Sequence, residues 1–365
     1  MSLVNQHGGD LELIERKYHI PKDELINFSG NVNPLGIADS IKKAIIDNID
    51  CLCRYPDVSY LELRTNISKY TGVDKDFIIA GNGATELISL FIKVVSAKNA
   101  VIISPSYSEY EREIKLNNGK VSLYPLKEEN DFNLITCEFL SSISSKTDMI
   151  VLCNPNNPTG TAVDTDDLKK ILEYSKKNNI YVMIDETYME FNDCIDKYSA
   201  VSLVKDFDNL FIIRGTSKFF AAPGLRLGYG LCSNKDILDS INSKKDPWSV
   251  NIFASVAGEV MFTDKEYISK TKKLISNERT KILNELKKWK NIKVYDTKSN
   301  FILIKILNSN ITSSFVFEKL IAKKMIIRDA SNFAFLGDEY LRFCILLPEQ
   351  NKMLLDNLYE IIESN

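Results

Sequence analysis

The sequence from residue 210 to residue 228 reads LFIIRGTSKFFAAPGLRLG. Its first four residues form an apolar run that predicts a buried strand, and Lys218 follows among small and aromatic residues. A lysine in apolar surroundings loses proton affinity, because burial disfavours its charged form. Such an amine can condense with a carbonyl cofactor, and Arg226 adds a fixed cation suited to a phosphate. The alternative interpretation is a surface lysine and an ion-paired arginine.

Other short apolar runs also end in polar clusters. These clusters are residues 81–86 after the run 77–80, residues 104–107 after 100–103, residues 154–160 after 149–153, and residues 185–188 after 180–184. Apolar strands that alternate with helices predict an α/β fold with a mostly parallel sheet covered by helices on both faces. Ligands bind beyond the carboxyl ends of the strands in such sheets. We therefore expect these clusters to converge on one site.

The chain is too long for one ordinary domain, and the pattern of its predicted strands and helices changes near residue 254. We expect an N-terminal arm over residues 1–40, a large cofactor-binding domain over residues 41–254, and a smaller α+β domain over residues 255–365. A long amphipathic helical region is predicted from about residue 254 to residue 290. The glycine-rich cluster at residues 81–86 lacks the third glycine of a dinucleotide-binding loop, because Glu86 stands there, but it can form a phosphate cup.

The composition excludes several classes of protein. The net charge is −3, and 44% of the 365 residues are hydrophobic. We see no basic stripe for a nucleic acid, no apolar run near the ~18 residues of a membrane helix, and no secretory signal at the N-terminus. Seven scattered cysteines and two histidines do not favour a zinc or other metal site. We therefore expect a cytoplasmic protein that binds neither nucleic acid nor membrane.

An aromatic aldehyde that carries a phosphate would impose specific needs if it were bound to Lys218. Its phosphate needs N–H donors, hydroxyl groups and a cation, its ring nitrogen needs a carboxylate, and its ring needs a flat partner. The candidates are Gly83, Ala84, Thr85, Ser217 and Arg226 for the phosphate, Asp185 for the nitrogen, Tyr107 for stacking, Asn157 and Tyr188 for the phenolate oxygen, and Arg342 for a substrate carboxylate. Each candidate also has an ordinary explanation: a turn cap, a core aromatic, a proline turn or an ion pair.

Three of these motifs together resemble the fold-type-I pyridoxal-phosphate aminotransferases, and the histidinol-phosphate aminotransferase branch in particular. The motifs are NPTG at residues 157–160, Asp185-Glu186-x-Tyr188, and Ser217-Lys218 with Arg226 eight positions after the lysine. The resemblance covers nearly the whole chain. It implies pyridoxal 5′-phosphate as the cofactor and catalytic roles for Lys218, Asp185 and Tyr188.

Further motifs are similar to those of the threonine-phosphate decarboxylases within this family. They are HGG at residues 7–9, FSGNVNPLG at 28–36, RYPD at 54–57, AGNG at 80–83 and PWSVN at 247–251. This similarity implies PLP-dependent decarboxylation of L-threonine O-3-phosphate to (R)-1-aminopropan-2-yl phosphate and CO2, as in cobalamin biosynthesis. It also implies a homodimer in which Tyr55 reaches the partner's cofactor phosphate. The substrate phosphate would then meet His7, Asn31 and Arg328, and Arg342 with Asn157 would hold the carboxylate.

Two other functions stay open at this point. The first is an aminotransferase that uses 2-oxoglutarate, with histidinol phosphate as its first candidate substrate. Tyr107 favours it, since the decarboxylases tend to have phenylalanine there. The second is a catalytically silent module that only binds the cofactor. Decarboxylation follows if the bond to the carboxylate is held perpendicular to the cofactor ring, and transamination follows if the Cα–H bond is held there. A sequence does not report which of the two bonds takes that position.

Overall fold

The computed structural model describes residues 10–364, and the largest sheet within that range has seven strands. In spatial order they are β2 (Ile78–Gly81), β8 (Gly228–Leu231), β7 (Leu210–Gly215), β6 (Tyr181–Asp185), β5 (Met149–Cys153), β3 (Asn99–Ser104) and β4 (Lys120–Pro125). The five strands from β7 to β4 are parallel to one another. β8 is antiparallel to both of its neighbours, β2 and β7. The predicted mostly parallel sheet is therefore confirmed.

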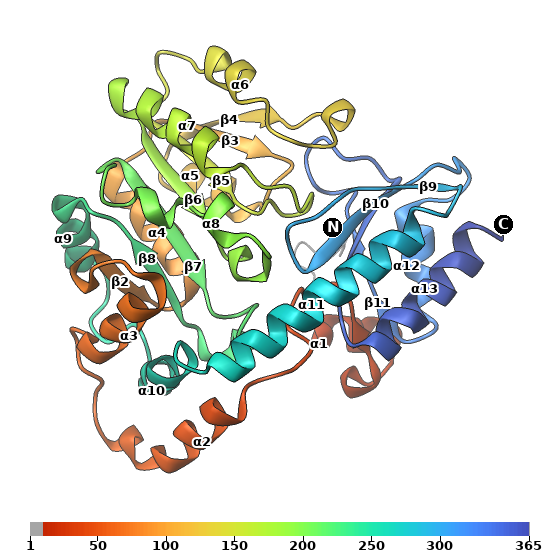
Figure 1. Cartoon of the computed structure of the whole chain (residues 1–365), viewed down its shortest axis with the longest axis horizontal. Coiled ribbons are helices and arrows are strands. Elements are labelled where there is room, and N and C mark those ends of the chain that lie inside the picture. Colours follow the sequence, from red (N-terminus) through yellow and green to blue (C-terminus); the bar gives the residue numbers. More distant parts are fainter. Residues whose placement is uncertain (1–9, 365) are drawn as a thin grey trace.

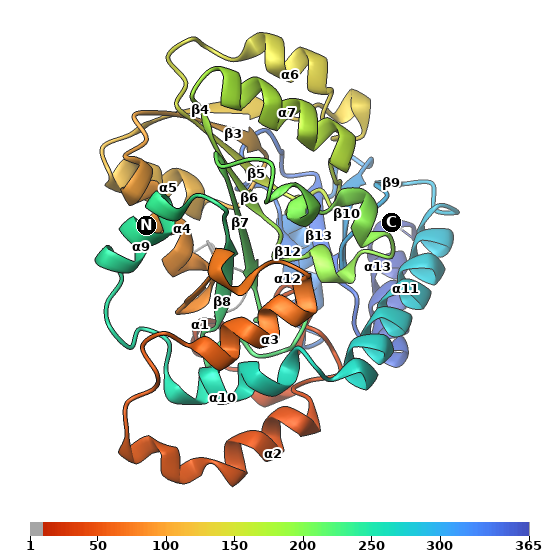
Figure 2. The same ribbon diagram turned by 60° about the vertical axis from the view of Figure 1, so that its left-hand side comes forward.

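Both faces of this sheet are covered, because alternate residues of its central parallel strands enter separate cores. In β7, Phe211 and Ile213 pack in one core, whereas Leu210 and Ile212 pack in the other. The first core includes α4 (Gly83–Val95), α5 (Glu109–Leu116) and α9 (Lys235–Lys244), and the second includes α3 (Leu61–Thr71), α6 (Thr136–Ser142) and α7 (Thr165–Lys177). Figure 2 shows α4, α5 and α9 on one side of the sheet and α7 on the other. The apolar runs are continuous for this reason.

The C-terminal part contains a second, antiparallel sheet. Its strands in spatial order are β12 (Arg328–Asp329), β13 (Tyr340–Cys344), β10 (Phe301–Ile306) and β9 (Ile292–Val294). The helices α12 (Ser313–Ile321) and α13 (Pro348–Ile362) accompany it (Figure 1). The predicted smaller α+β part is confirmed as an architecture, while its boundary at residue 254 stays a prediction.

The predicted helical region from residue 254 to residue 290 consists of two helices. α10 (Ile252–Met261) ends before α11 (Lys265–Leu286), where the side chain of Asp264 accepts a hydrogen bond from the N–H of Tyr267 and so caps α11. α11 runs from the large sheet to the small one in Figure 1. Within residues 10–364 no helix, α11 included, is long and apolar enough to cross a membrane.

The N-terminal segment joins the two parts of the molecule. After α1 (Leu11–Tyr18), strand β1 (Ile26–Asn27) pairs in parallel with β11 (Met325–Ile326). The N–H of Cys344 then donates to the carbonyl of Phe28, and the N–H of Asn33 donates to the carbonyl of Lys218. The helices α2 (Asp39–Asp47) and α8 (Ile195–Tyr198) complete the fold. The segment therefore lies between the small sheet and the loop that carries Lys218.

Candidate active site

A cavity of about 650 Å³ lies at the carboxyl ends of the large-sheet strands, next to β12 and β13. Most of the predicted site residues line it: Asn31, Gly83, Ala84, Thr85, Tyr107, Asn157, Asp185, Tyr188, Ser217, Lys218, Arg226, Arg328 and Arg342. Tyr55 lies elsewhere, with 76% of its surface exposed, and its ring packs on Trp248 at 4.5 Å. His7 lies outside the described residues. The cavity thus brings together groups from eight separate stretches of the chain.

The first turn of α4 forms one end of the cavity. α4 begins at Gly83, earlier than the apolar run from residue 87 indicates, so that the N–H groups of residues 83–85 belong to a helix N-terminus. Gly83 has a φ of +80°, and a Cβ there would lie 2.6 Å from Nη2 of Arg226. Only glycine fits this backbone conformation so close to the guanidinium group. Helix-terminal N–H groups beside an arginine make an anion site.

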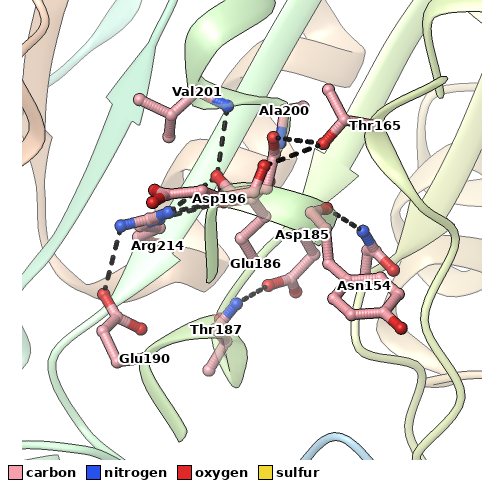
Figure 3. Close-up of polar contacts among 12 residues, drawn as sticks. Asn154, Thr165, Asp185, Glu186, Thr187, Glu190, Asp196, Ala200, Val201 and Arg214 are labelled. Atoms are coloured by element: carbon pink, nitrogen blue, oxygen red, sulfur yellow. Dashed lines mark hydrogen bonds and ion pairs between the residues drawn. The ribbon is translucent and has the colours of Figure 1, made fainter. Parts of the chain in front are cut away.

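Asp185 is the last residue of β6, and both of its carboxylate oxygens are held. The hydroxyl of Tyr110 donates to Oδ2 at 2.6 Å, and the N–H of Thr187 donates to Oδ1 at 2.9 Å. Figure 3 shows the contact with Thr187. Burial raises the pKa of Asp185, and the rise is opposed by the side chain of Thr187, the hydroxyl of Tyr110 and the N–H of Thr187. These donors therefore stabilise a buried carboxylate in one orientation.

The side chain of the next residue, Glu186, points away from that of Asp185 (Figure 3), and Glu186 does not line the cavity. Its Oε2 accepts from Nη2 of Arg214 at 2.7 Å, and its Oε1 accepts from the N–H of Ala200 at 2.6 Å. Arg214 also lies 3.6 Å from the carboxylate of Glu190. All three charged side chains are buried. This network fixes the end of β6, and so the position of Asp185.

Lys218 follows β7, and its amine points to the N-terminal segment. Nζ donates to the carbonyl of Gly30 at 2.8 Å. Burial, together with the nearby positive charge of Arg342, lowers the pKa of the amine to about 8. The amine is thus neutral in a substantial fraction of molecules near pH 8, as a nucleophile or a proton acceptor requires.

Arg342 and Arg328 face the cavity from the small sheet. Arg342 donates from Nη1 to Oδ1 of Asn157 and from Nη2 to the carbonyl of Ser29 at 2.7 Å. Arg328 donates from Nη2 to Oδ1 of Asn332 at 2.7 Å. Burial lowers the pKa of Arg328 to about 10, with a further contribution from Arg342. Two buried cations in one cavity indicate a ligand with more than one anionic group.

Aromatic and amide side chains line the space between these charges. Nδ2 of Asn31 donates to the hydroxyl of Tyr188 at 3.2 Å, whereas Oδ1 of Asn31 is buried and has no hydrogen-bond partner within residues 10–364. Burial raises the pKa of Tyr107 to about 12, so its hydroxyl stays protonated. An orphaned buried acceptor such as Oδ1 of Asn31 is costly unless a ligand satisfies it.

The residues of this cavity fit pyridoxal phosphate. Gly83 leaves a space that a Cβ would fill, beside Arg226 and the first turn of α4, where a phosphate can bind. Asp185 is an oriented carboxylate for the ring nitrogen, and Lys218 is an amine of low pKa. The sequence did not predict Tyr110, Thr187 or the carbonyl of Gly30 as part of the site. Tyr110 stands three positions after Tyr107, and this spacing was the one signal that pointed to it.

Comparison with known proteins agrees with this assignment. The family model described as aminotransferase class I and II matches residues 23–358. A protein of Caldanaerobacter subterraneus subsp. tengcongensis named putative threonine-phosphate decarboxylase is 40% identical over 91% of this chain and 89% of its own length. The histidinol-phosphate aminotransferase of Methanosphaera stadtmanae is 32% identical over 98% of this chain and 96% of its own. The solved structure of the histidinol-phosphate aminotransferase from Clostridium acetobutylicum is 33% identical, covers 93% of this chain and 99% of its own, and has a TM-score of 0.86.

Proposed function

This chain belongs to the class I and II aminotransferase family and is a pyridoxal-phosphate enzyme, and from this premise we propose that it decarboxylates L-threonine O-3-phosphate to (R)-1-aminopropan-2-yl phosphate and CO2. The observation that carries the proposal is the pair of buried arginines, Arg328 and Arg342, which line one cavity from neighbouring strands. A substrate with both a carboxylate and a phosphate engages the two cations at once. The similarity to proteins named threonine-phosphate decarboxylase supports the same substrate.

The cofactor would be held by the groups described above. The first turn of α4 with Ser217 and Arg226 would bind its phosphate, Asp185 its ring nitrogen, Tyr107 its ring face, and Asn157 with Tyr188 its phenolate oxygen. Lys218 would be its point of attachment. When bound, pyridoxal phosphate supplies an electron sink that stabilises negative charge at the substrate α-carbon.

The substrate-binding residues would decide which bond at the α-carbon breaks. Arg342 would bind the α-carboxylate through its guanidinium group, which also donates a hydrogen bond to Oδ1 of Asn157. Arg328 and Asn31 would bind the substrate phosphate and so set the rotation of the whole substrate. After the carboxylate has left as CO2, Lys218 can deliver a proton from Nζ to the α-carbon. In transamination Lys218 would instead remove the α-hydrogen.

The second candidate is an aminotransferase that acts on histidinol phosphate with 2-oxoglutarate. Tyr107 and the similarity to proteins named histidinol-phosphate aminotransferase favour it. Histidinol phosphate carries one anionic group, whereas glutamate carries two carboxylates, so both arginines would be used only in one half of that reaction. This uneven use makes the decarboxylase the better match to the cavity.

One incubation separates these functions. The holoenzyme is supplied with L-threonine O-3-phosphate, with and without 2-oxoglutarate, and CO2 and glutamate are measured. CO2 release that does not need 2-oxoglutarate supports the decarboxylase. Glutamate formation that needs 2-oxoglutarate, here or with histidinol phosphate, supports the aminotransferase. Neither product from either substrate supports a silent cofactor-binding module.

We also propose a homodimer, because a surface around residues 46–61 exposes large apolar side chains. Its members are Ile46, Ile49, Leu52, Val58 and Leu61. A second copy of the chain would cover this surface, and Tyr55 on the same surface would reach the partner's cofactor phosphate.

Leu52→Asp should then give a monomer by analytical ultracentrifugation. Mixing inactive Tyr55→Phe and Lys218→Ala subunits should restore activity, since each hybrid dimer contains one intact site, and no restoration would contradict a shared site.

A further inference from the structure

Tyr110 lies between two groups that are proposed to hold the cofactor ring. It is the second residue of α5, and its side chain is fully buried. Its hydroxyl donates to Oδ2 of Asp185 at 2.6 Å, and its ring meets that of Tyr107 edge to face, with centroids 5.5 Å apart and an interplanar angle of 84°. Tyr110 also lines the cavity. One side chain thus contacts both the nitrogen-facing carboxylate and the stacking aromatic.

The hydrogen bond to Asp185 has a clear physical consequence. A carboxylate at the end of a buried strand is expensive to ionise, and each donor that points to it lowers this cost. Thr187 lowers the pKa of Asp185 through its side chain and through the N–H that donates to Oδ1, and Tyr110 lowers it through the hydroxyl that donates to Oδ2. Without the hydroxyl, Asp185 could rotate, and its neutral form would be favoured. The ring nitrogen would then lose an ionised and oriented partner.

We propose that Tyr110 is a positioning residue that holds Asp185 ionised and aimed at the cofactor ring nitrogen. This inference rests on the role proposed above for Asp185, and it holds whichever reaction the enzyme catalyses. The alternative role for Tyr110 is to fill the core between α5 and the sheet. The two roles differ in one measurable respect: only the first depends on the nitrogen atom of the ring.

The test therefore compares two ligands of the apoenzyme, pyridoxal phosphate and its analogue in which a C–H group replaces the ring nitrogen. Dissociation constants are measured by equilibrium dialysis for the unaltered protein and for Tyr110→Phe, which keeps the ring contact with Tyr107. We expect affinity for pyridoxal phosphate to fall about 10-fold, as for a lost hydrogen bond to a charged group. Affinity for the analogue should stay unchanged, so the ratio of the two constants changes by the same factor.

Tyr295 offers a matched control. It is also a buried tyrosine, and its hydroxyl donates to Oε1 of Glu128 at 2.9 Å, away from the residues that line the cavity. Tyr295→Phe should lower the thermal midpoint as Tyr110→Phe does, but it should leave the ratio of dissociation constants unchanged. An unchanged ratio in Tyr110→Phe, or an equal change in both variants, would overturn the proposal.

Asp185→Asn separates a failure of this inference from a failure of its premise. Asp185→Asn should change the ratio by itself, and adding Tyr110→Phe to it should have no further effect, because the two residues act through one hydrogen bond. If Asp185→Asn leaves the ratio unchanged, the proposed role of Asp185 is wrong. If Asp185→Asn changes the ratio and Tyr110→Phe does not, only the role of Tyr110 is wrong. If Tyr110→Phe proves too unstable to purify, Tyr110→Met, which also removes the hydroxyl group, takes its place in the same measurement, and an unchanged ratio there would overturn the proposal.

Discussion

Arg328 and Arg342 are direct partners across the antiparallel strands β12 and β13, so two buried guanidinium groups lie side by side at the wall of one cavity. Like charges at opposed positions of a sheet are destabilising. The positive charge of Arg342 contributes, after burial, to the lowered pKa of Arg328. Burying two like charges in this arrangement therefore costs stability. An anionic ligand relieves the repulsion, and this is the physical basis of the proposed substrate.

The first prediction concerns Arg328→Gln. The variant should lose about 100-fold in kcat/KM for the phosphorylated substrate, mostly through KM, because a charge-assisted contact with the phosphate is lost. Its free energy of unfolding should fall only slightly, since the substitution removes the contacts of Arg328 with Asn332 and Phe333 but also removes repulsion between two cations. The measurements are steady-state kinetics and urea denaturation of the ligand-free protein.

Arg279→Gln is the contrasting variant for that prediction. Arg279 is also a buried arginine, but it pairs with Asp193 at 2.7 Å and donates to the carbonyl of Phe191. Its replacement should lower the free energy of unfolding. If Arg328→Gln destabilises the protein as much as Arg279→Gln does and leaves KM unchanged, Arg328 serves the fold and not the substrate.

The second prediction concerns the amine of Lys218. Only a neutral amine attacks the cofactor, and burial lowers the pKa of Lys218 to about 8. The rate of covalent attachment to pyridoxal phosphate, followed by borohydride trapping, should therefore rise with pH with a midpoint at about pH 8. Arg342→Gln should move the midpoint to higher pH, because a neighbouring positive charge that disfavours the ammonium form is removed.

Lys245 provides the control for this experiment. It too is a lysine whose pKa is lowered by burial, and its Nζ donates to the carbonyl of Ala80 at 2.9 Å. It does not line the cavity. Lys245→Ala should keep the trapped cofactor and the visible absorbance of the holoenzyme, whereas Lys218→Ala should lose both. Trapping that persists in Lys218→Ala would move the attachment point to another lysine.

The elements that the sequence predicted best are those whose signals are local. Helix α1 has the predicted bounds, 11–18, and the side chain of Asp10 caps it. Strand β5 also has the predicted bounds, 149–153, because its apolar run is continuous and ends at an asparagine–proline turn. The polar residues at the strand ends could also be predicted, because each one follows a recognisable apolar run. The carboxyl ends of parallel strands meet at one edge of the sheet, so these residues were expected to lie together.

The elements that the sequence did not reveal depend on contacts distant in the chain. β8 contains two glycines in four residues, a composition that disfavours a strand. It forms because it lies between β2 and β7, where a Cβ on Gly230 would approach the ring of Phe211 within 2.5 Å. The contact of Tyr110 with Asp185 likewise depends on how α5 packs on the sheet. No local pattern encodes that distance.

The third prediction concerns Gly83→Ala. A Cβ there would lie 2.6 Å from Arg226 at a φ of +80°, so the substitution should displace the arginine from the phosphate cup. We expect affinity for pyridoxal phosphate to fall about 10-fold or more, as for the loss of a charge-assisted contact. Gly72→Ala is the control, because Gly72 has a φ of +75° and open space around its Cβ position within the described structure. Both variants should lose about 1 kcal/mol of stability to the left-handed backbone, and only Gly83→Ala should bind the cofactor more weakly.

The last prediction concerns the buried network behind Asp185. Arg214 is the buried cation that pairs with both Glu186 and Glu190 (Figure 3). Arg214→Met should lower the free energy of unfolding by about 3–5 kcal/mol, because it leaves buried carboxylates without their counter-ion. Lys287→Met, which removes an exposed pair with Asp296, should cost less than about 1 kcal/mol.

The pH dependence of the Arg214→Met defect distinguishes lost charge from lost packing. Burial raises the pKa of Glu190 above its ordinary value of 4.5, and Arg214 opposes the rise. Without Arg214 the folded-state pKa of Glu190 should rise further, so the folded protein holds a proton that the unfolded chain releases. A group of this kind stabilises the fold at low pH, and that contribution is lost as pH rises through the folded-state pKa. The deficit measured by urea denaturation should therefore be larger at about pH 8 than at about pH 5, whereas an equal deficit at both would mean that Arg214 acts by packing alone.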